Sequence, residues 1–164
     1  MLDIRVKGID EAIRQLEACK ADLERRMHDI IQRLADIGIP VANAAFANVS
    51  YQGEQEKIEG QVVWQDDTHA AVVVSGRTVL FLEFGAGATY GYGHPAATEN
   101  GYGPGTWSDP MMGHGGKGRW NNPKGWYFAK GQKSWGNPPA RGMYDAGKQM
   151  RESVAAVARE VFGT

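Results

Sequence analysis

The sequence predicts an α+β protein, in which a small antiparallel sheet of three or four strands packs against a long N-terminal helix and a C-terminal helix. Apolar residues recur at three- and four-residue steps at both ends of the chain, and short β-branched and aromatic runs lie between them. A long segment rich in glycine and tryptophan then separates these runs from the last helix. A chain of 164 residues is of the size of one domain, so we expect a single domain over residues 1–164.

A long first helix is expected over residues 9–47. Its apolar residues form one stripe: Ile9, Ile13, Leu16, Leu23, Met27, Ile30, Ile31, Leu34, Ile37 and Val41. At the standard helical rise, residues 9–37 alone span roughly 40–45 Å. A small sheet needs less than this length, so one end of the helix is expected to project. Pro40 is expected to kink the helix.

A β-meander is expected over residues 59–84. Three short β-branched or aromatic runs lie there, with Asp66-Asp67 and Ser75-Gly76 as the turns between them. The third run is apolar on both faces, which predicts a central strand covered on both sides. Trp126-Tyr-Phe128 is a candidate for a fourth strand.

The segment over residues 85–138 is expected to be a basic insertion between two acidic halves. Between residues 85 and 142 the chain carries six Lys or Arg residues, two acidic residues and four of its five tryptophans. The C-terminal helix is expected over residues 139–162, because Asn137-Pro138-Pro139 gives it a sharp start and its apolar residues share one side.

Glu83 is the strongest candidate for catalysis, since it stands near the end of an apolar run. It could act as a general acid or base, or it could pair with a cation such as Arg141 or cap the next loop. No second carboxylate lies nearby to complete an acid/base pair. We therefore predict a protein that is not an enzyme and has no catalytic residues; the alternative is a small hydrolase that uses Glu83 and His114.

Metal and cofactor sites are not predicted. Of the four histidines, His94 and His114 lie in the insertion and neither has a partner at zinc-ligand spacing, and Cys19 is the single cysteine. The glycine-rich loops are not followed by a helix whose N-terminus could hold a phosphate. No run approaches the roughly 20 apolar residues of a membrane helix, so no membrane partner is expected.

The insertion itself is expected to form contacts with partners. Tryptophans are costly to leave in water, which favours their burial between subunits. Aromatic residues among cations could also stack on bases or sugars, so a nucleic-acid or glycan-binding module is the second alternative. The expected inter-subunit residues are Trp107, Trp120, Trp126, Tyr127 and Trp135. Residues expected to contact acidic surfaces or DNA are Lys117, Arg119 and Lys124. Core and loop geometry is assigned to Glu83, Phe84, Gly85, Gly136, Pro138, Pro139 and Arg141.

Several segments resemble one known family. They are Val6-Lys-Gly-Ile-Asp-Glu-Ala-Ile-Arg-Gln-Leu16, Phe81-Leu-Glu-Phe-Gly85, Gly103-Pro-Gly-Thr-Trp107, Gly116-Lys-Gly-Arg-Trp-Asn-Asn-Pro-Lys-Gly-Trp-Tyr127 and Trp135-Gly-Asn-Pro-Pro-Ala-Arg-Gly-Met-Tyr-Asp-Ala146. In this order they resemble the HK97 gp10-like family of tailed-phage proteins. The chain departs from that family at Ala86, where the family often has Thr, and at Gly142-Met143, where it often has Pro-Phe.

The resemblance implies a structural protein of the bacteriophage virion, without cofactors or catalysis. It would lie in the neck or upper tail, near the head–tail connector, and would take part in tail completion and in joining tail to head. It implies a homo-oligomeric ring, expected to be a hexamer, that touches head-closure and tail-terminator components and faces the passing DNA. Virus assembly would take place in the cytoplasm of the host bacterium.

Overall fold

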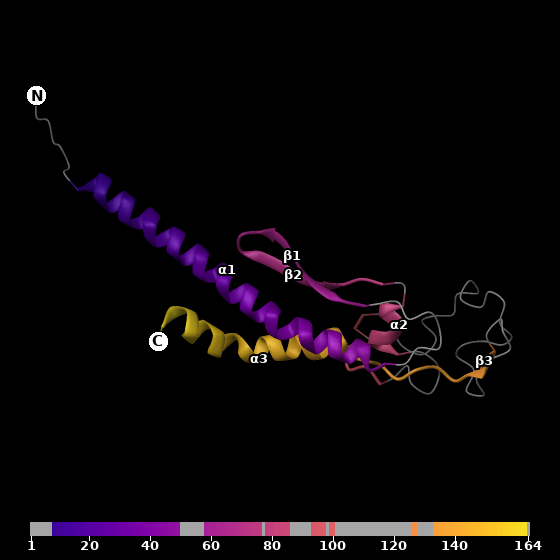
Figure 1. Cartoon of the computed structure of the whole chain (residues 1–164). Coiled ribbons are helices and arrows are strands. Elements are labelled where there is room, and N and C mark those ends of the chain that lie inside the picture. The colour runs from indigo at the N-terminus through magenta and orange to yellow at the C-terminus, as the bar shows by residue number, and fades with distance from the viewer. Residues whose placement is uncertain are drawn as a thin grey trace, which may run out of the picture.

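The computed structural model describes residues 8–49, 58–76, 78–85, 93–97, 99–100, 126–127 and 133–163. Their elements, in chain order, are α1 (Ile9–Ala47), β1 (Gly60–Asp66), β2 (His69–Val74), α2 (Val79–Phe84), β3 (Trp126–Tyr127), β4 (Lys133–Ser134) and α3 (Gly142–Phe162). The helix α3 runs back along the C-terminal half of α1, and the β1–β2 hairpin flanks α1 as well (Figure 1). The predicted α+β class, with two long helices packed together, is confirmed.

The first helix has the predicted bounds, and its 39 residues span about 58 Å. Pro40 lies inside the helix without ending it. A proline has no N–H to donate to the carbonyl of Asp36, four residues earlier, but both residues are exposed and water can reach that carbonyl. Asn48 ends the helix, and its backbone N–H donates to the carbonyl of Ala44 at 3.2 Å.

Small residues let α1 and α3 approach closely. A Cβ on Gly38 would lie 2.7 Å from Sδ of Met150, and a Cβ on Gly142 would lie 2.8 Å from the ring of Phe46. Both distances are shorter than side chains allow, so the two glycines set the separation of the helices. The core then forms at this end of the pair, from Ala42, Phe46, Val79, Leu82 and Ala146.

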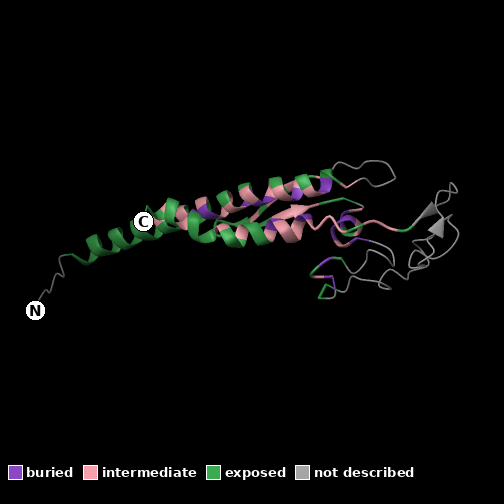
Figure 2. Ribbon diagram, turned by 90° about the horizontal axis from the view of Figure 1, so that it is seen from below, coloured by how far each residue is buried: buried purple, intermediate pink, exposed green. Residues whose placement is uncertain are grey.

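One end of α1 projects from the molecule, as the sequence predicted. The guanidinium of Arg26 donates to the carbonyl of Val161 at 3.2 Å, which places the end of α3 beside Arg26. Residues 9–25 extend beyond this point and are called the α1 arm below. Figure 2 shows this arm as almost entirely exposed, in contrast to the rest of the helix.

The predicted meander is wrong in its third strand, because residues 78–84 form the helix α2 and its N-cap. Val79, Leu82 and Glu83 share the buried face at helical spacing, while Leu80 is 46% exposed. A short apolar run fits a covered strand and a buried helical turn equally well, so periodicity alone did not distinguish them. The predicted fourth strand is also misplaced: Trp126–Tyr127 pairs with Lys133–Ser134 in a separate two-stranded sheet.

The main sheet is therefore a two-stranded antiparallel hairpin, paired from Gly60 with Val74 to Asp66 with His69. The amide of Gly60 donates to the side chain of Asn43 at 2.7 Å, which ties the strand to α1. At the other end, the ring of Trp64 stacks on the ring of His28 with centroids 4.0 Å apart. The hairpin is thus attached to α1 at two separate points. Among the described helices, none is long and apolar enough to span a membrane.

Candidate functional site

The ends of α2 and α3 meet in a junction built from residues distant in sequence. Three groups from residues 137–141 donate to the last carbonyls of α2. The side-chain amide of Asn137 reaches Phe81 at 3.0 Å, the amide of Ala140 reaches Leu82 at 2.6 Å, and the amide of Arg141 reaches Glu83 at 3.3 Å. These bonds engage the backbone of Ala140 and Arg141 outside the helix, Arg141 is left-handed with φ of +60°, and α3 starts at Gly142 rather than at the predicted residue 139.

The Glu83 carboxylate provides the reverse connection, because it caps α3. Its Oε2 accepts the backbone N–H of Met143 and its Oε1 accepts that of Tyr144, each at 2.9 Å. A helix leaves its first N–H groups without intrahelical partners and carries a partial positive charge at that end. Glu83 is only 5% exposed, and these charge-assisted bonds offset the cost of burying its carboxylate.

His94 completes the environment of Glu83. Its Nε2 lies 3.2 Å from Oε1 of Glu83, and its Nδ1 accepts the backbone N–H of Ala96 at 3.1 Å. Because Nδ1 accepts the bond from Ala96, Nε2 is the ring nitrogen that faces Glu83 and can donate to it. The rings of Phe84 and Tyr144 flank the imidazole at 4.5 and 5.3 Å.

In this junction the two ionisable side chains face groups of the protein. Both oxygens of Glu83 are engaged by donors of the protein, and the side chains of Glu83 and His94 are 6% and 2% exposed. A general acid or base must come within hydrogen-bonding distance of a substrate proton, whereas both groups here bond to groups of the protein. Among the described residues no group of three His, Cys, Asp or Glu could hold a metal ion.

The predicted pairing of Glu83 with the Arg141 side chain is wrong. The guanidinium of Arg141 instead bonds Asp145 at 2.9 Å and lies over the ring of Tyr144. The sequence predicted that Glu83 could cap the loop that follows it. In the structure Glu83 caps a helix, α3, which begins 59 residues later. Only the tertiary structure brings these segments together.

Glycines and prolines fix the close approach at the same junction. Gly85 has φ of +74°, and a Cβ there would lie 2.8 Å from the backbone nitrogen of Pro139 and 2.9 Å from the carbonyl of Asn137. Gly136 has φ of +103°. Of the residues to which the sequence assigned core and loop geometry, the carbonyl of Glu83 accepts the backbone N–H of Arg141, Gly85 lies against Pro139, and Phe84 flanks the ring of His94.

The other predicted site residues lie mostly in the insertion. Trp126 and Tyr127 form β3, and Trp135 follows β4 with 52% of its surface exposed. The remaining ones lie outside the described residues: Trp107, Trp120, His114, Lys117, Arg119 and Lys124.

The α1 arm is the most exposed apolar surface of the described chain. Its large side chains alternate at four- and three-residue steps, and the most exposed is Leu16 at 70%. This spacing is that of a coiled-coil seam, with Lys20 at one of the seam positions. The exposed members are Ile9, Ile13, Leu16, Leu23 and, at the base of the arm, Met27.

Sequence reasoning missed two features of these sites. It did not place His94 beside Glu83, although His94 lies only 11 residues later, because no local pattern marks that contact. It predicted that one end of the first helix projects, but it did not identify which part of the apolar stripe would be exposed. Comparison with known proteins adds no assignment: no family model, curated protein or solved structure matches the chain.

Proposed function

We propose that the chain is a structural protein of a tailed-bacteriophage virion, which acts in the neck or upper tail as a homo-oligomeric ring. In this role it completes the tail and joins it to the head. The resemblance of the Gly/Trp-rich segments to the HK97 gp10-like family supports the location in the particle. A sixfold ring is the stoichiometry that this resemblance implies.

The observation that carries the proposal is the α1 arm. A helix that exposes five large apolar side chains along one seam leaves a continuous surface that water solvates poorly. In an assembled ring, a neighbouring subunit would remove this surface from water. An assembly component therefore accounts for the arm better than a monomeric enzyme or binding module does.

The Glu83 junction supports a structural role as well. The hydrolase alternative depends on Glu83, and that carboxylate is buried while it holds the start of α3 and the His94 ring. Its contacts explain its position without a reaction.

Under this proposal the insertion serves the contacts between components. The tryptophans and Tyr127 would pack between subunits, and Lys117, Arg119 and Lys124 would face acidic surfaces of head-closure or tail-terminator components or the passing DNA. The protein would be a virion component that is assembled in the host cytoplasm.

The deciding experiment is electron microscopy of lysates from the parent phage with this gene deleted. Separate filled heads and finished tails, which rejoin when the purified protein is added, are the expected result. Abnormally long or absent tails would move the protein into tail assembly proper. Intact infectious particles would overturn the proposal.

A matched pair of variants links this experiment to the arm. Leu16→Asp places a charge on the seam and should fail to restore joined particles. Ala18→Asp places the same charge on the opposite face of the same exposed helix and should restore them. Equal rescue by both variants would show that the seam is not used in assembly.

A further inference from the structure

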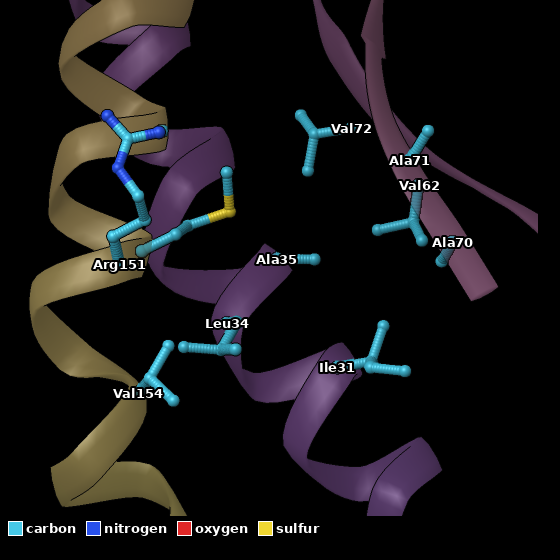
Figure 3. Close-up of a pocket in the computed structure, with 11 residues that line it drawn as sticks. Ile31, Leu34, Ala35, Val62, Ala70, Ala71, Val72, Arg151 and Val154 are labelled. Carbon is cyan, nitrogen blue, oxygen red and sulfur yellow. The ribbon is translucent and has the colours of Figure 1, made fainter. Parts of the chain in front are cut away.

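A second apolar surface lies on the body of the molecule, in a groove between α1, α3 and the β1–β2 hairpin. Its volume is about 350 Å³. Figure 3 shows Leu34 and Ile31 on its floor, Val62 and Val72 on the hairpin wall, and Val154 on the α3 wall. An apolar side chain of suitable size would remove this aliphatic surface from water by filling the groove.

One charged residue stands on the wall of the groove. The guanidinium of Arg151 lies over Gly147, with Nη1 3.5 Å from the position that a Cβ would occupy there. Within the described part of the chain, Arg151 forms no hydrogen bond or ion pair. The groove therefore combines apolar walls with a cation that lacks a counter-charge.

The α1 arm carries the complementary features. Ile13 and Leu16 project from its seam, and Glu17 follows directly on the flank. Glu17, like Arg151, has no ion pair among the described residues. Asp10, Glu17 and Glu24 are seven residues apart, so the flank forms an acidic row along one side of the seam.

We propose that the arm of one copy of this chain docks into the groove of the next copy, with Ile13 and Leu16 against its apolar walls and Glu17 beside Arg151. The docking rests on the homo-oligomeric ring of the proposed function and identifies its contact. It is head-to-tail, since arm and groove are different surfaces, and such contacts close into a ring when the rotation between copies allows it.

An arm does not reach the groove of its own chain. Arm and groove floor belong to one continuous helix, and the arm extends away from the half of α1 that α3 and the hairpin flank (Figure 1). A symmetric pair of arms is also disfavoured by charge. In an antiparallel pair the acidic rows of the two arms would face each other and repel. In a parallel pair each acidic row would face the uncharged Ala12 and Cys19, which provide no attraction. The groove, in contrast, offers Arg151.

Photo-crosslinking from Cys19 tests the docking directly. Cys19 is exposed on the arm, two residues from Glu17, and is the single thiol of the chain, so a benzophenone maleimide labels the unmodified sequence at one place. We expect crosslinked dimers whose peptides join the arm to α3 or to the β1–β2 hairpin. Crosslinks from arm to arm, or a protein that sediments as a monomer and yields no crosslinked dimer, would overturn the docking.

A charge exchange provides the second test. Glu17→Arg and Arg151→Glu should each weaken self-association about tenfold or more in sedimentation velocity, and the double variant should recover it. Arg159→Glu is the control, because Arg159 lies on α3 outside the groove and should not rescue Glu17→Arg. Failure of the Arg151 double variant to recover association would contradict the predicted contact.

The two proposals fail in different experiments. Rings whose crosslinks avoid the groove would overturn the docking and leave the virion function standing. Groove crosslinks in a protein whose deletion leaves intact particles would overturn the function and leave the docking standing.

Discussion

The two halves of α1 differ in burial although their sequences follow the same pattern. Ile13 in the arm is 47% exposed, whereas Ile30 in the body is 8% exposed, and both belong to one stripe with the same spacing. The difference arises because α3 ends beside Arg26 and covers only the second half. The spacing of apolar residues therefore shows that a helix face needs a partner, and the position of α3 decides which part finds that partner within the chain.

The largest expected difference in stability is between substitutions of two glycines with positive φ, one in the body of the molecule and one at the start of the arm. Gly85→Ala should destabilise the monomer by about 4 kcal/mol, because it adds left-handed strain and a clash with the backbone of Pro139. Gly8→Ala has nothing within 4 Å of the new Cβ and sits where the helix can fray, so its cost should stay below about 1 kcal/mol. Urea denaturation measures the free energy of unfolding of both variants. Equal losses would show that the backbone around Pro139 does not pack closely against Gly85.

The next effect concerns the cap that holds the body together. Glu83→Ala should lower the free energy of unfolding by about 3 kcal/mol, because it leaves two N–H groups of α3 and the Nε2–H of His94 without their acceptor. Glu83→Gln keeps one oxygen and should lose about half as much. Urea denaturation, with the imidazole tautomer of His94 followed by NMR, distinguishes these cases. A stability unchanged in Glu83→Ala would contradict the capping role.

A third prediction compares the same substitution in both halves of the helix. Ile30→Ala should cost about 2–3 kcal/mol of monomer stability, since it removes buried methyl groups from the covered half of α1. Ile13→Ala should cost less than about 0.5 kcal/mol when the protein is dilute enough to be monomeric. Hydrogen exchange should likewise protect the amides of the body far more than those of the arm. Similar protection in both halves of a monomer would contradict an uncovered arm.

The smallest effect is expected at the tip of the hairpin, outside both halves of α1. The hydrogen bond with His69, and then the backbone N–H of Thr68, lower the pKa of Asp66 to about 2. Because the folded pKa lies below the unfolded value of roughly 3.9, this stabilisation is present above about pH 4 and is lost as the pH falls toward 2. Asp66 is fully exposed, so the change should be slight. Asp66→Asn should remove this small loss of melting temperature between about pH 4 and pH 2. A variant whose melting temperatures follow the same pH dependence as the original protein would contradict the prediction.

The sequence was sufficient for the elements whose pattern is long. The 39 residues of α1 repeat one apolar spacing many times, and the two strands of the hairpin alternate around a turn marked by Asp66-Asp67. Residues 78–84 contain only one short apolar run. Such a run fits a covered strand and a buried helical turn equally well, so the sequence does not distinguish them. The mistaken third strand follows from this shortness, and with it the mistaken number of strands in the sheet.

The candidate site was predictable in its residue types and unpredictable in its connections. Glu83, Gly85, Pro139 and Arg141 were identified from local composition, but their roles depend on contacts across more than 50 residues. The charge of Glu83 gave reason to expect a partner, and Arg141 was a reasonable cation to choose. The actual partners are two backbone amides and the ring of His94, which no charge pattern reveals.

By itself, the sequence determined the bounds of the first helix, the end of the last helix, the hairpin and the presence of an apolar stripe, because backbone propensity and periodicity act over neighbouring residues. The tertiary structure alone decided that residues 78–84 are helical, that Glu83 caps α3 beside His94, and that the stripe is buried beyond Arg26 and exposed before it. The physical reason is that burial and the satisfaction of backbone donors depend on which distant segments arrive at the same place.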